Sequence, residues 1–172
     1  MRKSRYQVQN DIKMATYFQT SLKSLQYRLR RFKPVLEKEL IAAVDKYDIH
    51  IIEMIRDEQL YKYGINGREI ELMSIKPYTL ATMKRKQKRH QPIDRVTLRD
   101  TGEFYGSLYV DHDDKGFYVT SADDDKREYL IDLYGPEIFR LTNENLSRFL
   151  KEYVKPELKK KMEAYLKEKN TW

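Results

Sequence analysis

Helical periodicity over the first third of the chain constrains the fold more than any other feature of the sequence. Apolar residues recur there at steps of three and four, with a mean of about 3.4, close to the 3.5-residue repeat of a helix that packs along one partner helix. Pro34 is the first proline or glycine to interrupt the pattern, and it predicts a kink or the start of a second helix. The residues at this spacing before it are Val8, Ile12, Ala15, Phe18, Leu22, Leu25, Leu29 and Phe32.

The helical spacing continues beyond Pro34 and ends at a glycine. Gly64 is placed to terminate the helix, and residues 65–67 are typical of a turn. We therefore expect residues 5–62 to form two helices or one bent helix. The apolar positions of this second stretch are Leu36, Leu40, Val44, Tyr47, Ile51 and Ile55.

The composition excludes several classes of protein. The 172 residues include no cysteine, which excludes disulfides, thiolate catalysis and cysteine-ligated zinc. No apolar run approaches the ~18 residues that span a bilayer, so we expect no membrane contact. The basic start, residues 1–6, is followed by no apolar stretch, so we expect no secretory signal and synthesis in the cytoplasm. The 14 Tyr and 6 Phe, with the periodic aliphatic residues, can build a core.

Charge is divided unevenly along the chain. Residues 1–95 hold 21 Lys and Arg against 11 Asp and Glu, a net charge of +10, whereas residues 96–172 hold 13 against 16, a net charge of −3. A protein divided in this way can bind a polyanion, or it can bind its own copies head to tail.

The densest basic run lies in residues 64–98, where the only regular element we expect is a short helical turn at residues 79–89. Its cations have three interpretations: they contact nucleic-acid phosphates, they keep a loop solvated, or they meet an acidic segment of another subunit. We favour the third, because the sequence has no known nucleic-acid-binding module. The run consists of Lys84, Arg85, Lys86, Lys88 and Arg89.

A capping pattern and then a hairpin pattern follow the basic run. Asp100 is placed to cap a short helix, with Glu103 reaching back, and Phe104 and Leu108 then share one face. Alternation of apolar and polar residues predicts two strands, joined by an acidic turn, over residues 108–121.

Further helices are predicted for the rest of the chain. A second acidic turn at residues 123–125 precedes a helix over 127–134 and a short strand over 138–141. Thr142 is placed to cap a final helix, which we expect to kink at Pro156 because proline removes one backbone hydrogen bond.

No pattern typical of catalysis emerges. His50 has no second histidine four positions away, so we interpret it as a helix-surface residue and not as a zinc ligand. The turn at residues 111–116 fails as a calcium loop, because Lys115 and Ala122 stand where oxygen ligands are needed. A phosphate-binding glycine loop and a nucleophile elbow are also absent. We therefore expect a protein that is not an enzyme and uses no cofactor or metal.

Two stretches resemble a family of tailed-bacteriophage proteins, the tail-completion, virion-morphogenesis and head–tail joining (neck) proteins. Residues 76–84 resemble a family loop with Pro, Thr and Lys, and residues 97–108 its Thr-Gly signature, which is followed by Ser-Leu. Residues 117–121 are similar to the family's return strand, and residues 129–135 to a short helix that ends in glycine. The residues that match the signature and the helix end are Leu98, Thr101, Gly102, Phe104, Ser107, Leu108, Tyr134 and Gly135.

The resemblance covers residues 34–155 and suggests a division of the chain. The helix of residues 5–32 is extra, and residues 137–141 replace a strand common in the family. We therefore expect an N-terminal helical extension, residues 1–33, that acts as an interaction arm, and an α+β domain, residues 34–172. The expected fold combines a long N-terminal helix or two helices, a small antiparallel sheet with short helices, and a kinked C-terminal helix.

The resemblance implies a structural virion protein. It would be a subunit of a six- or twelve-fold homo-oligomeric ring at the neck or upper tail, contacting the portal or connector and the tail proteins, with a passing contact to genomic DNA. The alternative, from the residues themselves, is a cytoplasmic nucleic-acid-binding protein, a packaging accessory or regulator, that uses the basic run.

Overall fold

A computed structural model describes residues 30, 32–113 and 116–168 of this chain. The predicted helix of residues 5–32, which makes up most of the predicted interaction arm, therefore lies almost wholly outside the described residues.

The chain divides into two units, residues 1–39 and residues 40–172. In the first unit, residues 32–39 are helical, and the Lys33 ammonium lies 3.7 Å from the Glu37 carboxylate one turn along the helix. The second unit contains the remaining elements.

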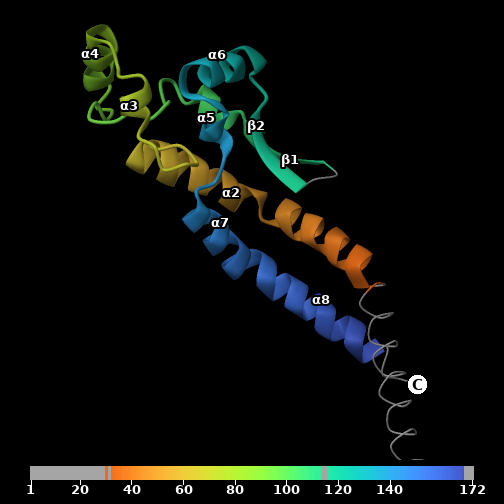
Figure 1. The fold of residues 1–172 in the computed structure, drawn as a ribbon. Coiled ribbons are helices and arrows are strands. Elements are labelled where there is room, and N and C mark those ends of the chain that lie inside the picture. The colour runs from red at the N-terminus through yellow and green to blue at the C-terminus, as the bar shows by residue number, and fades with distance from the viewer. Residues whose placement is uncertain (1–29, 31, 114–115, 169–172) are drawn as a thin grey trace, which may run out of the picture. The chain divides into compact units, whose positions relative to one another are not determined.

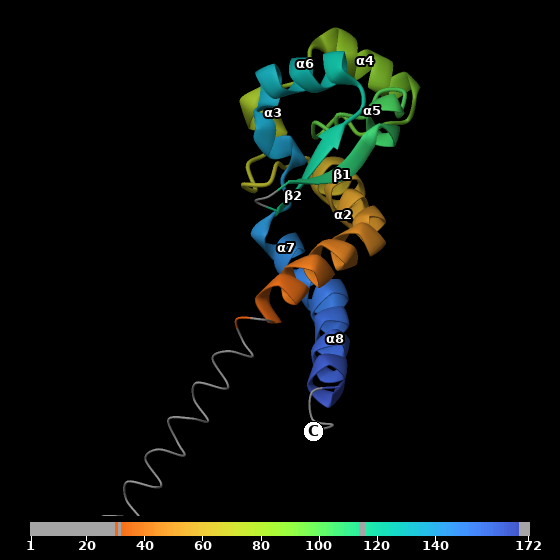
Figure 2. The ribbon, with the colours of Figure 1, turned by 90° about the vertical axis from the view of Figure 1, so that its right-hand side faces the viewer.

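The second unit has the α+β fold that the sequence predicts, with one small antiparallel sheet among short helices (Figures 1 and 2). None of the helices in the described part of the chain has the length and apolar content that a bilayer crossing requires. Helical residues 40–46 come first. The elements that follow are α2 (Asp48–Glu53), η1 (Met54–Tyr63), α3 (Leu72–Ile75), α4 (Leu80–Lys88), α5 (Glu103–Gly106), β1 (Leu108–Asp113), β2 (Gly116–Ser121), α6 (Asp124–Tyr134), η2 (Pro136–Phe139), α7 (Asn143–Phe149), η3 (Leu150–Val154) and α8 (Lys155–Glu168).

The continuous helix of α2 and η1 supplies the centre of the core. Ile51, Ile55 and Leu60 are fully buried, and burial of an aliphatic side chain of this size contributes about 1.5–3 kcal/mol. η1 is a π-helical segment, and Gly64 ends it with a φ of 66°, as predicted. A side chain at this glycine would also lie 2.9 Å from Cβ of Arg95, so the position is restricted by both backbone and packing.

The hairpin covers the central helix. β1 and β2 pair antiparallel with Leu108 opposite Ser121, and β1 packs against α2. Val119 is buried, and the Phe117 ring lies 6.3 Å from that of Phe149. The predicted strands and their alternation are confirmed.

The last helix is capped and bent as predicted. The Thr142 hydroxyl accepts the backbone N–H of Asn145 at 3.2 Å and caps α7. The N–H of Lys155 donates to the carbonyl of Leu150, five positions back, so the helix widens into the π-helical η3 directly before Pro156. The wider turn lies where proline lacks the N–H for a regular helical bond.

Aromatic rings join the α2 helix to the C-terminal helix. The ring of Tyr153 stacks on His50 at 4.4 Å between centroids and on Phe149 at 5.6 Å, and it lies 5.2 Å from Tyr47. His50 is half-buried by this contact, and its Nδ1 lies 3.1 Å from the Glu53 carboxylate. His50 therefore lies at the helix surface, as predicted, but one face of its ring packs on Tyr153.

Buried amides connect η1 to the start of α7. The Gln59 side chain, 1% exposed, donates to the carbonyl of Arg140 at 2.9 Å and accepts the N–H of Thr142 at 2.9 Å. Asn145 donates to the Gln59 oxygen at 3.1 Å and to the carbonyl of Met54 at 3.4 Å. These bonds satisfy polar groups that would otherwise be buried without partners, which costs about 1–3 kcal/mol for each group.

Two local predictions near α6 are wrong. Residues 123–125 do not form a separate turn, because Asp123 accepts the N–H of Lys126 at 3.0 Å and caps α6, which begins at the next residue. Residues 138–141 are not a strand. Pro136 starts a 3₁₀ turn there, with Ile138 buried in the core. Asp123 thus caps the N-terminal end of α6, and the acidic side chains there complement the positive end of the helix dipole.

Glu157 on α8 generates a pH-dependent contribution to stability. Its carboxylate accepts from Lys46 at 2.8 Å and from the Tyr47 hydroxyl at 2.9 Å, and these bonds lower its pKa to about 2. The contribution is present above the ordinary pKa near 4.5 and is lost as pH falls toward 2. In Glu157→Gln, we expect the melting temperature to fall less steeply between pH 5 and 2 than in the unmodified protein. Melting curves over this range measure the slope.

Glu163→Gln is the matched control, because Glu163 lies on the same helix and its carboxylate is 4.0 Å from Lys159, at the surface. It is expected to leave the slope unchanged. Equal slopes for Glu157→Gln and the unmodified protein would contradict the role given to Glu157.

Candidate contact surface around helix α4

The predicted helical turn at residues 79–89 is helix α4. The basic run occupies its second half, with Arg89 directly after it, and the side chains of the run have different roles. Thr79 caps the helix by accepting the N–H of Thr82 at 3.2 Å. Lys86 is 3% exposed, whereas Lys84 and Lys88 are exposed. The five predicted contact residues therefore do not form one surface.

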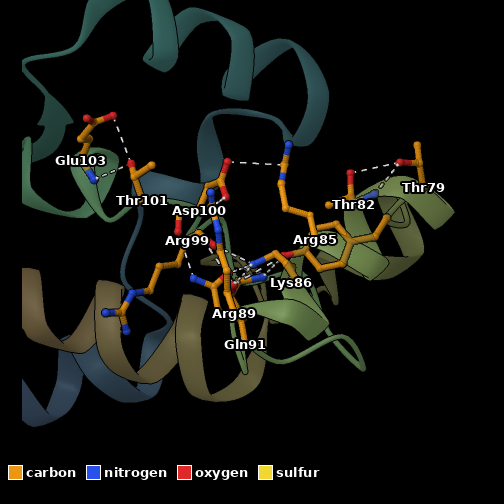
Figure 3. A network of polar contacts seen from close by, with 12 residues as sticks. Thr79, Thr82, Arg85, Lys86, Arg89, Gln91, Arg99, Asp100, Thr101 and Glu103 are labelled. Atoms are coloured by element: carbon orange, nitrogen blue, oxygen red, sulfur yellow. Dashed lines mark hydrogen bonds and ion pairs between the residues drawn. The ribbon is translucent and has the colours of Figure 1, made fainter.

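Lys86 is bonded inside the subunit (Figure 3). Its ammonium donates to the carbonyl of Arg99 at 2.6 Å, to the Thr97 hydroxyl at 3.1 Å and to the Gln91 amide oxygen at 3.1 Å. It also lies 5.0 Å from the ring centre of Tyr78. All three N–H groups are used and the charge faces an aromatic ring. The prediction that Lys86 contacts a partner or a polyanion is therefore corrected: the residue holds α4 on the following segment.

Arg85 and Arg89 share one carboxylate. Asp100 lies 3.4 Å from a guanidinium nitrogen of Arg85 and is hydrogen-bonded to Arg89, and Figure 3 shows both side chains pointing toward it. The predicted role of Asp100 as a helix cap is wrong, because its oxygens are taken by these arginines. The carboxylate offsets part of the positive charge that the sequence assigns to α4, and at the surface each such pair contributes at most about 1 kcal/mol.

Lys84 and Lys88 remain as the outward cations of the run. Both are exposed, and neither forms an ion pair among the described residues. Of the five predicted contact residues, these two are free to meet a partner, and the half-exposed guanidinium groups of Arg85 and Arg89 flank them.

The signature segment next to α4 contains unusual backbone conformations. Leu98 has a φ of 54°, rare for a branched side chain, and Gly102 has a φ of 103°. Gly102 stands directly before α5, where the Thr101 hydroxyl accepts the N–H of Glu103 at 3.4 Å and donates to its carboxylate at 3.1 Å. Thr101 and Gly102 thus shape the turn into α5.

The remaining signature residues hold α5 in place. Phe104 is buried with its ring 6.0 Å from that of Phe139, in an edge-to-face arrangement. Leu108 is buried at the start of β1. The Ser107 hydroxyl donates to the carbonyl of Phe104 at 2.8 Å and lies 2.7 Å from the Ser121 hydroxyl. These contacts tie the short helix to the hairpin.

Two tyrosines anchor this region by their hydroxyl groups. Tyr105 donates to the carbonyl of Thr97, and burial raises the pKa of its phenol. Tyr134 donates to the carbonyl of Lys76 at 3.2 Å, and burial raises its pKa to about 12. Gly135 follows with a φ of 82° and ends α6, as predicted. Tyr134 is among the residues that match the family. The anchoring role of Tyr105 was not predicted, because nothing in the neighbouring sequence indicates that its hydroxyl bonds the carbonyl of Thr97.

A pocket of about 250 Å³ lies between α4 and α6. α4 contributes Thr82 and Arg85 to its wall, α6 contributes Lys126 and Tyr129, and Leu98 lies between them. Within the described residues, no three His, Asp or Glu side chains gather as metal ligands. The side chains that line the pocket include cations and threonine hydroxyls, which are suited to polar and ionic contacts.

Comparison with known proteins found no match: no protein family, no curated protein and no solved structure is similar enough to this chain to be paired with it.

The buried ammonium of Lys86 should contribute to stability. In Lys86→Met, the amide, hydroxyl and carbonyl oxygens that it bonds lose their donor, so we expect the free energy of unfolding to fall by about 2 kcal/mol. Lys84→Met removes the same charge from an exposed position two residues away and should change it by less than about 0.5 kcal/mol. Chemical denaturation of the two variants measures the difference, and equal stabilities would refute the internal role of Lys86.

Gly102 should tolerate no side chain, for backbone reasons alone. A Cβ at Gly102 or at Gly106 meets nothing within 4 Å, but the positive φ belongs to Gly102 only. We expect Gly102→Ala to lower the free energy of unfolding by about 1–2 kcal/mol. Gly106→Ala, in helix α5, should be neutral or stabilising. Thermal melts of both variants test this, and a neutral Gly102→Ala would contradict it.

Proposed function

We propose that this protein is a structural subunit of a tailed-bacteriophage virion, which forms a ring at the neck or upper tail and joins the head to the tail. One observation carries the proposal. A long helix, a segment with Pro77, Thr79 and Lys84, a Thr-Gly turn, a hairpin and a short helix ended by Gly135 follow one another in the order that the resemblance to the neck and tail-completion proteins implies.

The use of polar groups supports a structural role. Several polar groups form their hydrogen bonds within the subunit, to backbone carbonyls or neighbouring side chains; they belong to Lys86, Ser107 and Tyr105. These groups stabilise the turn and the hairpin, and the exposed charges of the helices are left to make contacts with other molecules.

Nucleic-acid binding is the second candidate function, favoured by the two outward lysines on α4. Lys84 and Lys88, with Arg85 and Arg89 beside them, could neutralise phosphates along a duplex. Binding would then weaken steeply with salt, and each phosphate-contacting residue removed would reduce the salt slope by about one. Binding that is absent or flat across salt would eliminate this candidate.

Assembly provides the test of the first proposal. Native mass measurements of the purified full chain, alone and with extracts of virions, are expected to show a closed ring or a complex with portal or tail proteins. Purified virions are expected to contain the chain in a multiple that matches the ring. Virions without the chain would refute the proposal.

A further inference from the structure

Helix α4 presents a cationic stripe. Lys84 and Lys88 stand one turn apart, are exposed, and form no ion pair among the described residues. Leu80, one turn before Lys84, is 78% exposed. Residues at this spacing share one face of a helix, so the stripe combines two free cations with an apolar side chain at its end.

Helix α6 presents an acidic stripe. Asp125, Glu128 and Asp132 follow one another at steps of three and four, and all three are exposed. None of them forms an ion pair in the part of the chain that the structure describes. The other acids at this helix start are in use, because Asp123 caps the helix and Asp124 lies 2.5 Å from Arg127.

The pocket between the two helices fixes the direction of each stripe. Thr82 and Lys86 face it from α4, and Lys126 and Leu130 face it from α6. At about 100° per residue, each stripe falls on the side of its helix turned away from the pocket. The helices lie at the same end of the unit (Figures 1 and 2). The stripes therefore face outward on opposite sides of that end.

We propose that the α4 stripe of one copy binds the α6 stripe of the next copy. Because opposite sides of one subunit carry opposite charges, every copy can bind two neighbours in the same sense, which is the contact that closes into a ring. Leu80, 78% exposed at the end of the α4 stripe, supplies apolar area that charges alone lack. The inference rests on the ring function proposed above and names the contact within it.

A duplex is a poorer occupant of this end of the unit. Within the part of the chain that the structure describes, the three carboxylates of the α6 stripe and the two lysines of the α4 stripe form no ion pair. A polyanion could neutralise only the lysines and would leave the acidic stripe without a partner, whereas a second copy meets each stripe with its complement.

Charge reversal of the full-length chain tests the proposal. Lys84→Glu/Lys88→Glu makes both stripes acidic, and Glu128→Lys/Asp132→Lys makes both basic. Each variant alone should need at least about a tenfold higher concentration for half assembly, measured by sedimentation at low salt. Mixed in equal amounts, the two should assemble again, because every α4 stripe now finds an oppositely charged α6 stripe.

Lys151→Glu/Lys155→Glu is the matched control, with the same charge change and spacing on exposed positions of the C-terminal helix. It should assemble like the unmodified protein. If the unmodified chain forms rings and the two reversal variants do so equally well, this contact is wrong and the ring function stands. An unmodified chain that stays monomeric and is absent from virions refutes both. Loss of duplex binding in Lys84→Glu/Lys88→Glu, with assembly unchanged, assigns the stripe to nucleic acid and overturns the proposal.

Discussion

The buried ammonium of Lys86 is the interaction on which the α4 end of this protein depends. Among the described residues no carboxylate pairs with it, so neutral oxygens and one tyrosine ring must replace its hydration completely. Its acceptors come from residues 91–99, which lead into the signature turn. With Lys86 pointing inward, helix geometry directs Lys84 and Lys88 outward. A single side chain thus positions both the turn and the charged surface.

Elements governed by local chemistry could be predicted from the sequence. Gly64 and Gly135 end helices because a positive φ suits glycine, and Thr142 caps α7 because its hydroxyl reaches an N–H three residues on. The hairpin follows from alternation over residues 117–121. In each case the deciding partner lies within a few residues, so the pattern in the chain contains the physical cause.

Elements governed by distant partners could not be predicted in the same way. Asp100 is well placed to cap a helix, yet Arg85 and Arg89 reach it from another helix and compete successfully. Gln59 carries no local signal, because its partners are more than eighty residues away. Lys86 follows half-buried Met83 by three positions, but Leu80, the other large apolar residue of α4, is exposed, so the apolar pattern of this helix does not direct Lys86 inward.

The signature and the charged stripes bear differently on function. The backbone conformation explains the Thr-Gly pair. The residue before α5 has a φ of 103°, which favours glycine at position 102, and the Thr101 hydroxyl bonds the first N–H of the helix. Such a pair is explained within one subunit, whatever the subunit joins. Among the described residues, Lys84 and Lys88 of α4 and Asp125, Glu128 and Asp132 of α6 form no ion pair. In the contact proposed above, their partners are the opposite charges of a neighbouring copy. The turn therefore bears on how the chain folds, whereas the stripes bear on which molecule the folded subunit contacts.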